Sequence, residues 1–162
     1  SIVDMPLIER IAQERVVPIP GTTFLHYTRP AYEANLGRER FRYAYAMKTF
    51  AKHGIVAAAS SDTPVVPVDP LLGIETMVTR LDRNGGNAWT EEAISVDDSI
   101  RAYTVNAAFA SHEEMIKGTL QSGYLADLTV FDRDLRSVTP TEIHTARVDA
   151  TIQDGAGVYE RA

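Results

Sequence analysis

The stretch GIVAAASSDTPV, residues 54–65, decides how this chain folds. Its apolar run, residues 55–60, lacks the polar–apolar alternation of a half-exposed strand. A parallel strand that is buried on both faces has this pattern. Asp62 follows the run directly, and barrel enzymes gather their reactive groups where parallel strands end. The stretch therefore predicts a buried parallel strand with a carboxylate at its mouth.

The segments before this run continue the alternation of helix and strand. Asp4 is suited to cap a helix, and residues 16–20 form a short apolar run typical of a strand. We predict a polar loop over residues 21–30 and then a second helix that ends at Gly54. The apolar faces of the two helices comprise Leu7, Ile8, Ile11 and Ala12, and Tyr43, Met47, Phe50 and Ala51. Helix, strand, helix and strand in this order indicate the βα repeat of a parallel sheet or barrel.

The middle of the chain is predicted to be helical. Asp69-Pro70 opens a helix over residues 71–81, and residues 83–90 form a loop with two glycines. Capping boxes predict two further helices, over residues 95–108 and 111–118. The capping residues are Ser95 with Asp98 and Ser111 with Glu114.

The end of the chain is predicted to be β-structure. The apolar period changes from 3.6 to 2, which predicts strands over residues 126–131 and 147–152. A turn over residues 154–157 folds the end back as a hairpin. We place an organisational boundary near residues 118–125.

The composition excludes several classes of function. Of 162 residues, 44% are hydrophobic and 23% are charged, which is typical of a globular domain. The net charge is −6 and basic residues form no dense patch, so nucleic acid is not an expected partner. The absence of cysteine excludes disulfides, zinc–thiolate sites and thiol nucleophiles. No run resembles a signal peptide or a membrane span, so we expect a cytoplasmic location and no membrane partner.

The sequence around Asp62 allows two interpretations of this residue. A carboxylate at the end of a strand can bind a divalent cation and accept a proton from water whose pKa the cation lowers. Aspartates also settle turns before proline, and Pro64 is two residues further on. The local segment supports both interpretations equally.

Two groups of segments resemble one known family. Residues 54–65, with DPLLGI at residues 69–74 and Thr79-Arg80, resemble the eighth-strand region of the amidohydrolase superfamily, in its family 3 branch. GTLQSGYLADLTVFD, residues 118–132, is similar to the segment by which such chains leave their barrel and complete a β-sandwich. The resemblance spans roughly residues 5 to 159.

The resemblance implies a fold and an activity. Residues 1–120 are expected to be the C-terminal part of a (β/α)8 TIM barrel, an α/β fold, and residues 121–162 to be strands of an accessory β-sandwich. The implied reaction is hydrolysis of a non-peptide carbon–nitrogen bond, in an amide or cyclic amide of a small-molecule substrate. The implied cofactor is a divalent metal, with zinc the expected ion. In this family the eighth-strand aspartate ligates the metal and carries a proton to the leaving nitrogen, and Asp62 matches it.

The chain also departs from the family pattern. Family members hold their metal with a His-x-His pair on the first strand and with ligands on the fourth, fifth and sixth strands, and none of these has a counterpart here. The histidines are too widely spaced for a metal motif: they are His26, His53, His112 and His144. A whole barrel takes about 250 residues. We therefore expect this chain, a fragment, to be inactive alone and to complete its site with the remainder of the same protein or another copy of the chain.

Two further residues have a substrate-binding interpretation. His26 follows the predicted seventh strand on the side of the pocket, and the alternative is a solvated loop histidine. Arg80 is suited to a substrate carboxylate, and the alternative, which we favour, is an ion pair with Asp69 or Glu75.

Two functions from different classes follow. The first is enzymatic: a metal-dependent hydrolase in which Asp62 is the proton shuttle and a metal ligand. The second is a non-catalytic module that assembles through an exposed barrel edge, because an open parallel sheet leaves unpaired backbone and apolar surface.

Overall fold

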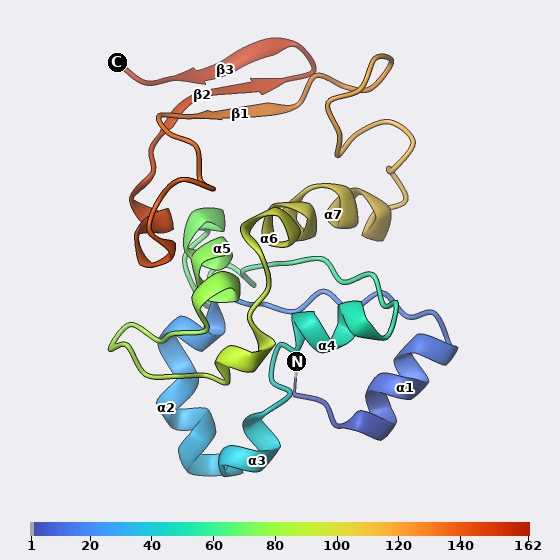
Figure 1. Cartoon of the computed structure of the whole chain (residues 1–162). Coiled ribbons are helices and arrows are strands. Elements are labelled where there is room, and N and C mark those ends of the chain that lie inside the picture. Colours follow the sequence, from blue (N-terminus) through green and yellow to red (C-terminus); the bar gives the residue numbers. More distant parts are fainter. Residues whose placement is uncertain (1) are drawn as a thin grey trace.

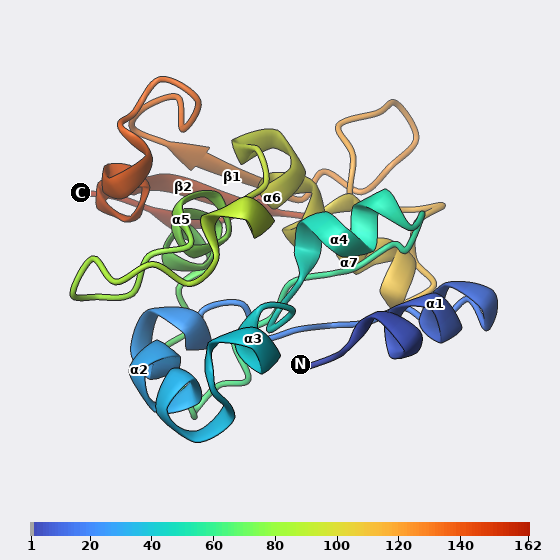
Figure 2. The ribbon, with the colours of Figure 1, turned by 60° about the horizontal axis from the view of Figure 1, so that its bottom comes forward.

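The computed structural model describes residues 2–162, in which helices precede a small sheet (Figure 1). The α-helices are α1 (Met5–Gln13), α2 (Phe24–Leu36), α3 (Arg38–Phe41), α4 (Met47–Lys52), α5 (Pro70–Thr79), α6 (Val96–Tyr103) and α7 (Val105–Ala110). Two 3-10 helices are η1 (Thr90–Glu92) and η2 (Pro140–Thr145), and the strands are β1 (Leu128–Phe131), β2 (Val148–Gln153) and β3 (Ala156–Glu160). Figure 2 shows α1 and α2 at opposite ends of the helical body.

Three predicted helix starts are confirmed together with their caps. The Asp4 carboxylate accepts the amide of Leu7 at 3.0 Å at the start of α1. Asp69 caps α5 in the same way. Ser95 caps α6 as predicted, because its hydroxyl accepts the Asp98 amide at 3.0 Å, and this hydroxyl donates to the Asp98 carboxylate at 2.7 Å. Each cap satisfies an N–H group that has no partner within its helix.

The two predicted parallel strands are extended but form no regular ladder. The amides of Ala58 and Ser60 donate to the carbonyl oxygens of Pro18 and Pro20, both at 3.1 Å. A parallel ladder also needs return bonds, which N–H groups of residues 16–20 would donate to residues 55–60. Both prolines lack an N–H group. The prediction of regular strands over residues 16–20 and 55–60 is therefore wrong in this respect, although the two segments lie side by side.

The two faces of residues 55–60 have different surroundings. The odd-numbered side chains are buried in a hydrophobic cluster with residues of α1, α4, α5 and α6. On the opposite face Val56 is 38% exposed and Ile19 of the neighbouring segment is 55% exposed, whereas Ala58 is buried at 1%. Successive side chains of an extended segment point to opposite faces. One face of this pair is therefore packed against helices, and the other is open at Val56 and Ile19.

The predicted loop over residues 21–30 is wrong, because α2 begins at Phe24 and continues through Pro30. A proline inside a helix cannot donate to the carbonyl four residues earlier. That carbonyl belongs to His26, and it accepts the backbone amide of Arg83 at 3.0 Å instead. The loop after α5 therefore satisfies the acceptor that Pro30 leaves free.

Two further helix predictions need correction. The helix predicted over residues 95–108 breaks at Thr104, whose φ is −120° and ψ is −88°, into α6 and α7. The helix predicted over residues 111–118 is absent from this described segment. The Ser111 hydroxyl donates to the Glu113 carboxylate at 2.7 Å, and among the described residues no backbone amide donates to it as a cap requires.

The C-terminal sheet confirms the predicted strands and hairpin. β1, β2 and β3 pair antiparallel in sequence order, and Asp154-Gly155 forms the turn between β2 and β3. The sheet lies beyond α5, α6 and α7 in Figure 1. A hydrophobic cluster joins this region to α5 and contains Leu71, Ile74, Leu135, Ile143 and Ala146. The boundary near residues 118–125 stays a prediction.

Candidate functional site

A hollow of about 490 Å³ lies where the two extended segments end. Small-molecule sites in proteins are clefts of about 300–1,000 Å³, so the hollow is of suitable size for a small substrate. Its lining residues are Ile2, Ile19, Gly21, Phe24, Tyr32, Tyr45, Ser60 and Asp62. Asp62, the residue that the sequence singled out, therefore lies beside a polar and aromatic hollow.

The backbone and the carboxylate of Asp62 have separate roles. Its φ of 59° lies in the left-handed region, which aspartate tolerates better than most residues. Its carbonyl accepts the amide of Val65 at 2.9 Å, so the backbone forms a turn around Pro64. Within residues 2–162, no hydrogen bond or ion pair engages the exposed Asp62 carboxylate. The side chain is therefore available to a ligand.

Aromatic rings form one wall of the hollow. Phe24 and Tyr45 stack with centroids 6.3 Å apart and planes inclined by 14°. Gly21 permits this arrangement, because a Cβ atom there would lie 2.9 Å from the ring of Phe24. Ile19 extends the apolar surface from the neighbouring segment. The half-buried Phe24 and the exposed Ile19 therefore give the hollow an apolar surface, whereas Tyr45 is almost fully buried.

Two tyrosine hydroxyls meet at this wall. The hydroxyl oxygens of Tyr32 and Tyr45 are 2.8 Å apart, and either group can donate. Tyr45 is buried at 3% exposure, whereas Tyr32 is half-buried. Sequence analysis missed both residues, because Tyr32 lies on the unpredicted helix α2 and Tyr45 lies outside any regular element.

Arg80 is not in the hollow but fixes one of its residues. Its guanidinium is 2% exposed and donates to the backbone carbonyls of Ala44 at 3.0 Å, Tyr45 at 3.1 Å and Ala88 at 2.9 Å. The favoured ion pair with Asp69 or Glu75 is not among the contacts of the described residues. Burial lowers the pKa of Arg80 to about 10, so it remains charged at neutral pH. Its partners are carbonyls, which suits a buried cation with five N–H donors.

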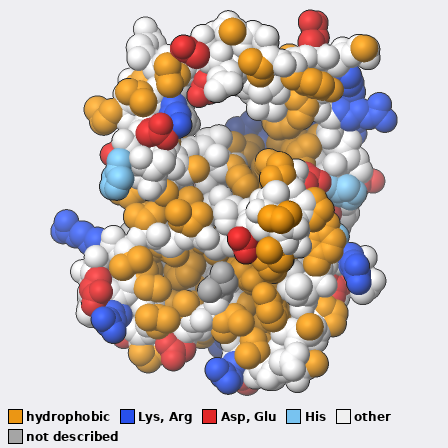
Figure 3. Space-filling view, turned by 180° about the vertical axis from the view of Figure 1, so that it is seen from behind, with side chains coloured by type: hydrophobic (Ala, Val, Ile, Leu, Met, Phe, Trp, Pro, Cys, Tyr) orange, Lys and Arg blue, Asp and Glu red, His pale blue; other side chains and the backbone are white. Residues whose placement is uncertain are grey.

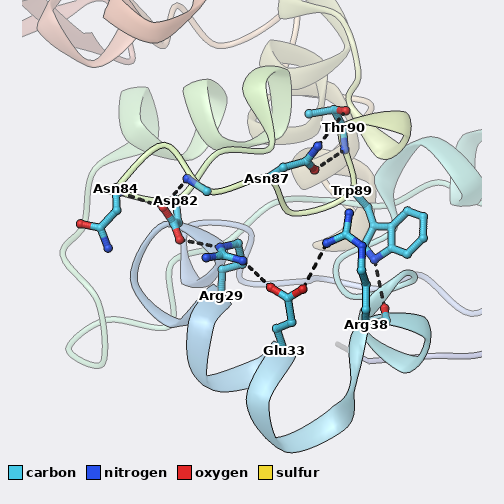
Figure 4. Close-up of polar contacts among 9 residues, drawn as sticks. Arg29, Glu33, Arg38, Asp82, Asn84, Asn87, Trp89 and Thr90 are labelled. Atoms are coloured by element: carbon cyan, nitrogen blue, oxygen red, sulfur yellow. Dashed lines mark hydrogen bonds and ion pairs between the residues drawn. The ribbon is translucent and has the colours of Figure 1, made fainter.

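A chain of charged side chains anchors α2, which carries Phe24 and Tyr32 of the hollow (Figure 4). Arg29 donates to Asp82 at 2.5 Å and pairs with Glu33, which also pairs with Arg38 at 3.2 Å. The guanidinium of Arg38 lies 4.7 Å from the ring centroid of Trp89, and the indole N–H donates to the Arg38 carbonyl at 3.1 Å. These contacts link α2 and α3 to the loop after α5.

His26 lies outside the set of residues that line the hollow. His26 is half-buried on α2, and its ring centroid lies 4.9 Å from that of Tyr27. Burial lowers the pKa of His26, and the carboxylate of Glu75 opposes this shift. The interpretation as a loop histidine is wrong, because the residue is helical.

The Asp62 carboxylate is the group at the hollow that is suited to bind a divalent cation. Oxygen ligands suit such cations, and the Asp62 carboxylate is exposed and unpaired in the described structure. No group of three or more histidine, aspartate or glutamate side chains gathers as a metal site within residues 2–162. Asp62 therefore fits the role of one ligand of a site whose other ligands come from elsewhere.

The structure is similar to those of metal-dependent hydrolases with a TIM barrel. A metal-dependent hydrolase of Pyrococcus horikoshii superposes with a TM-score of 0.76 and 25% identity, over 86% of this chain and 29% of that chain. This similarity confirms the predicted α/β fold class. The model of the amidohydrolase family matches residues 1–159, and the chain belongs to this family.

Curated relatives agree with the family and are much longer than this chain. The putative amidohydrolase YtcJ of Bacillus subtilis is 34% identical over 165 residues, which cover all of this chain and 31% of YtcJ. The N-substituted formamide deformylase of Arthrobacter pascens is 30% identical over 117 residues, which cover 72% of this chain and 22% of that protein. The chain thus spans less than a third of either relative. Among the described residues, no helix combines the length and apolar character that a membrane span requires.

Proposed function

We propose that this chain is the C-terminal part of a metal-dependent hydrolase that cleaves a non-peptide carbon–nitrogen bond, in an amide or cyclic amide. The observation that carries the proposal is the unpaired carboxylate of Asp62, which lines a hollow of about 490 Å³ at the end of a buried segment. The relative named as an N-substituted formamide deformylase supports amides as the substrate class.

Asp62 has two tasks in this proposal. Its carboxylate is one ligand of the divalent cation, which we expect to be zinc, and the remaining ligands come from the part of the protein outside this chain. A bound divalent cation polarises a carbonyl group and lowers the pKa of water. The Asp62 carboxylate accepts a proton from the attacking water and delivers it to the leaving nitrogen, as general base and then general acid.

The substitution Asp62→Asn in the full-length protein tests both tasks. Asparagine keeps the shape of the side chain but cannot accept the proton, so turnover of an N-substituted formamide should fall about 10²- to 10⁴-fold. Metal content is measured by plasma mass spectrometry. A lower metal content would show that a metal ligand is lost, and an unchanged content would show that only the proton shuttle is lost.

Ser61→Ala is the matched control, because its hydroxyl is in the same turn and contacts the Thr63 hydroxyl at 3.0 Å. Its turnover should remain within a few-fold of the unmodified protein. An Asp62→Asn protein with near-normal turnover would refute the role of Asp62. Turnover of an Xaa-Pro dipeptide and of no simple amide would refute the bond class.

A second proposal concerns the chain by itself: it is a non-catalytic module that assembles through its open face. Val56 and Ile19 favour this proposal, because they are 38% and 55% exposed on the face that the helices do not cover. Figure 3 shows many hydrophobic side chains at the surface of the molecule. The mass of the isolated chain by light scattering tests it, and a monomer would contradict assembly.

A further inference from the structure

We propose that Tyr32 is a specificity-determining residue, which binds a polar substituent at the end of an aromatic substrate amide. The inference rests on the proposed hydrolase function, because it concerns the same hollow. It adds the class of substrate: an amide with a planar aromatic group that carries a hydroxyl or similar hydrogen-bonding atom.

The hydroxyl pair adds two polar groups to the residues that line the hollow. Tyr32 and Tyr45 share one hydrogen bond of 2.8 Å, so one of the two protons is used within the pair. Each hydroxyl oxygen has a donor hydrogen and two acceptor lone pairs. The half-buried Tyr32 hydroxyl is therefore able to accept from, or donate to, a group in the hollow. The more deeply buried Tyr45 orients it.

Contacts of the backbone of Tyr45 and of the ring of Tyr32 fix the position of the two tyrosines. Tyr45 has a φ of 52°, a backbone conformation that is uncommon for residues other than glycine. The guanidinium of Arg80 donates to the carbonyls of Tyr45 and of Ala44 before it. The ring of Tyr32 lies 6.1 Å from that of Tyr45 and 6.1 Å from that of Phe41. A fixed hydroxyl distinguishes substrates better than a mobile one, because less ordering is required on binding.

The apolar wall determines the body of the substrate. Phe24 and Ile19 line the same hollow as Tyr32 and Tyr45 and add apolar surface to it. Aromatic rings stack on one another at centroid separations of about 4.5–7 Å, so a planar ring in the substrate can contact the half-buried ring of Phe24. Asp62 lies in the same hollow and acts on the scissile amide. One molecule with an amide, a ring and a terminal hydroxyl therefore uses all three features.

A pair of compounds that differ in one hydroxyl tests the proposal. Acetanilide and 4-hydroxyacetanilide are titrated by calorimetry into the full-length Asp62→Asn protein, in which turnover is suppressed. The hydroxylated compound should bind about 3- to 10-fold more tightly, the effect of one net hydrogen bond. Tyr32→Phe should remove this preference and leave the affinity for acetanilide unchanged. Tyr45→Phe should reduce the preference, because Tyr32 then loses its orienting partner.

Tyr27→Phe is the matched control, because Tyr27 is on the same helix and does not line the hollow. It should keep the full preference, and circular dichroism should show equal helix content in all variants. An unchanged preference in Tyr32→Phe, or binding of neither compound at millimolar concentration, would overturn the proposal. Failure of the proposed hydrolase function is recognised separately, because it appears as normal turnover in the Asp62→Asn protein.

Discussion

Arg80 and Asp82 place two opposite charges in the interior beside the same loop, and each has a different set of partners. The guanidinium of Arg80 donates to the backbone carbonyls of Ala44 and Tyr45, about 35 positions earlier in the chain. The carboxylate of Asp82, whose side chain is 0% exposed, binds Arg29 and the amides of Asn84 and Gly86. A buried charge is costly unless hydrogen bonds surround it, and both residues meet this condition.

Asp82→Asn should destabilise the chain by about 2–3 kcal/mol, because a buried charge-assisted contact is lost and Arg29 keeps Glu33 as its remaining carboxylate partner. Burial raises the pKa of Asp82, but hydrogen bonds from Arg29 and the Gly86 amide lower it below its usual value. Because the folded-state pKa is depressed, this stabilisation is present above a pH of about 4 and is lost as the pH falls through the folded-state pKa. Urea unfolding at pH 7 and at pH 3 should show that the difference between the two proteins narrows in acid.

The control for this prediction is Asp134→Asn. Asp134 is exposed and accepts the amide of Arg136 at 3.0 Å. An exposed contact of this kind contributes at most about 1 kcal/mol. Equal losses in the two variants would show that the buried position of Asp82 has no special effect.

At the scale of single residues, the sequence predicted contacts between near neighbours and missed those between distant ones. Asp4, Asp69 and Ser95 cap helices that begin at the next residue, so their role is visible in a short window. The carbonyl partners of Arg80 are distant in sequence, and the pair Tyr32–Tyr45 is separated by an unpredicted turn. Asp62 was singled out by its position after the apolar run, and its catalytic role stays a proposal.

At the scale of elements, prolines account for the largest differences between prediction and structure. Pro18 and Pro20 prevent a complete ladder between the two extended segments. Pro30 by itself predicts a loop, because it leaves the carbonyl of His26 without its helical donor. The amide of Arg83 donates to this carbonyl instead, and α2 continues. A local pattern cannot report this compensation, because the compensating group is about 50 residues away.

The break between α6 and α7 also has a function in the fold. It leaves the carbonyl of Ala102 free to accept the amide of Ala59 at 3.0 Å. The side-chain amide of Asn106 donates to the carbonyl of Ala57 at 2.9 Å. Both contacts are on the edge of residues 55–60 that faces away from the neighbouring extended segment. The edge is therefore satisfied by helical residues of the same chain.

Asn106→Ala should destabilise the chain by about 1 kcal/mol. The carbonyl of the buried Ala57 loses its partner, which costs about 1–3 kcal/mol, and the better helix propensity of alanine offsets part of this loss. Urea unfolding measures the change. Asn35→Ala is the control, because Asn35 also donates to a backbone carbonyl, at 2.7 Å, but is exposed on α2. A loss in Asn35→Ala as large as that in Asn106→Ala would contradict this account.

At the scale of the whole molecule, one face of the extended pair is packed against helices and the other is open at Val56 and Ile19. The buried face contacts four helices, whereas Val56 is 38% exposed on the open face. In the hydrolase proposal, this face and the mouth at Asp62 are completed by the rest of a longer protein. In the module proposal, another copy covers it. The two proposals therefore differ in what happens when the 162-residue chain is alone in solution.

A charge on the open face should separate these cases. If copies associate through it, Val56→Glu should shift the chain toward the monomer in light scattering, because each contact would bury an unpaired carboxylate. Val158→Glu makes the same change on β3, where Val158 is 58% exposed, and should leave the mass unchanged. A monomeric unmodified chain would contradict assembly through this face, and dissociation by Val158→Glu alone would move the contact to the sheet. The hydrolase proposal survives either result, because it assigns the open face to residues of the same polypeptide.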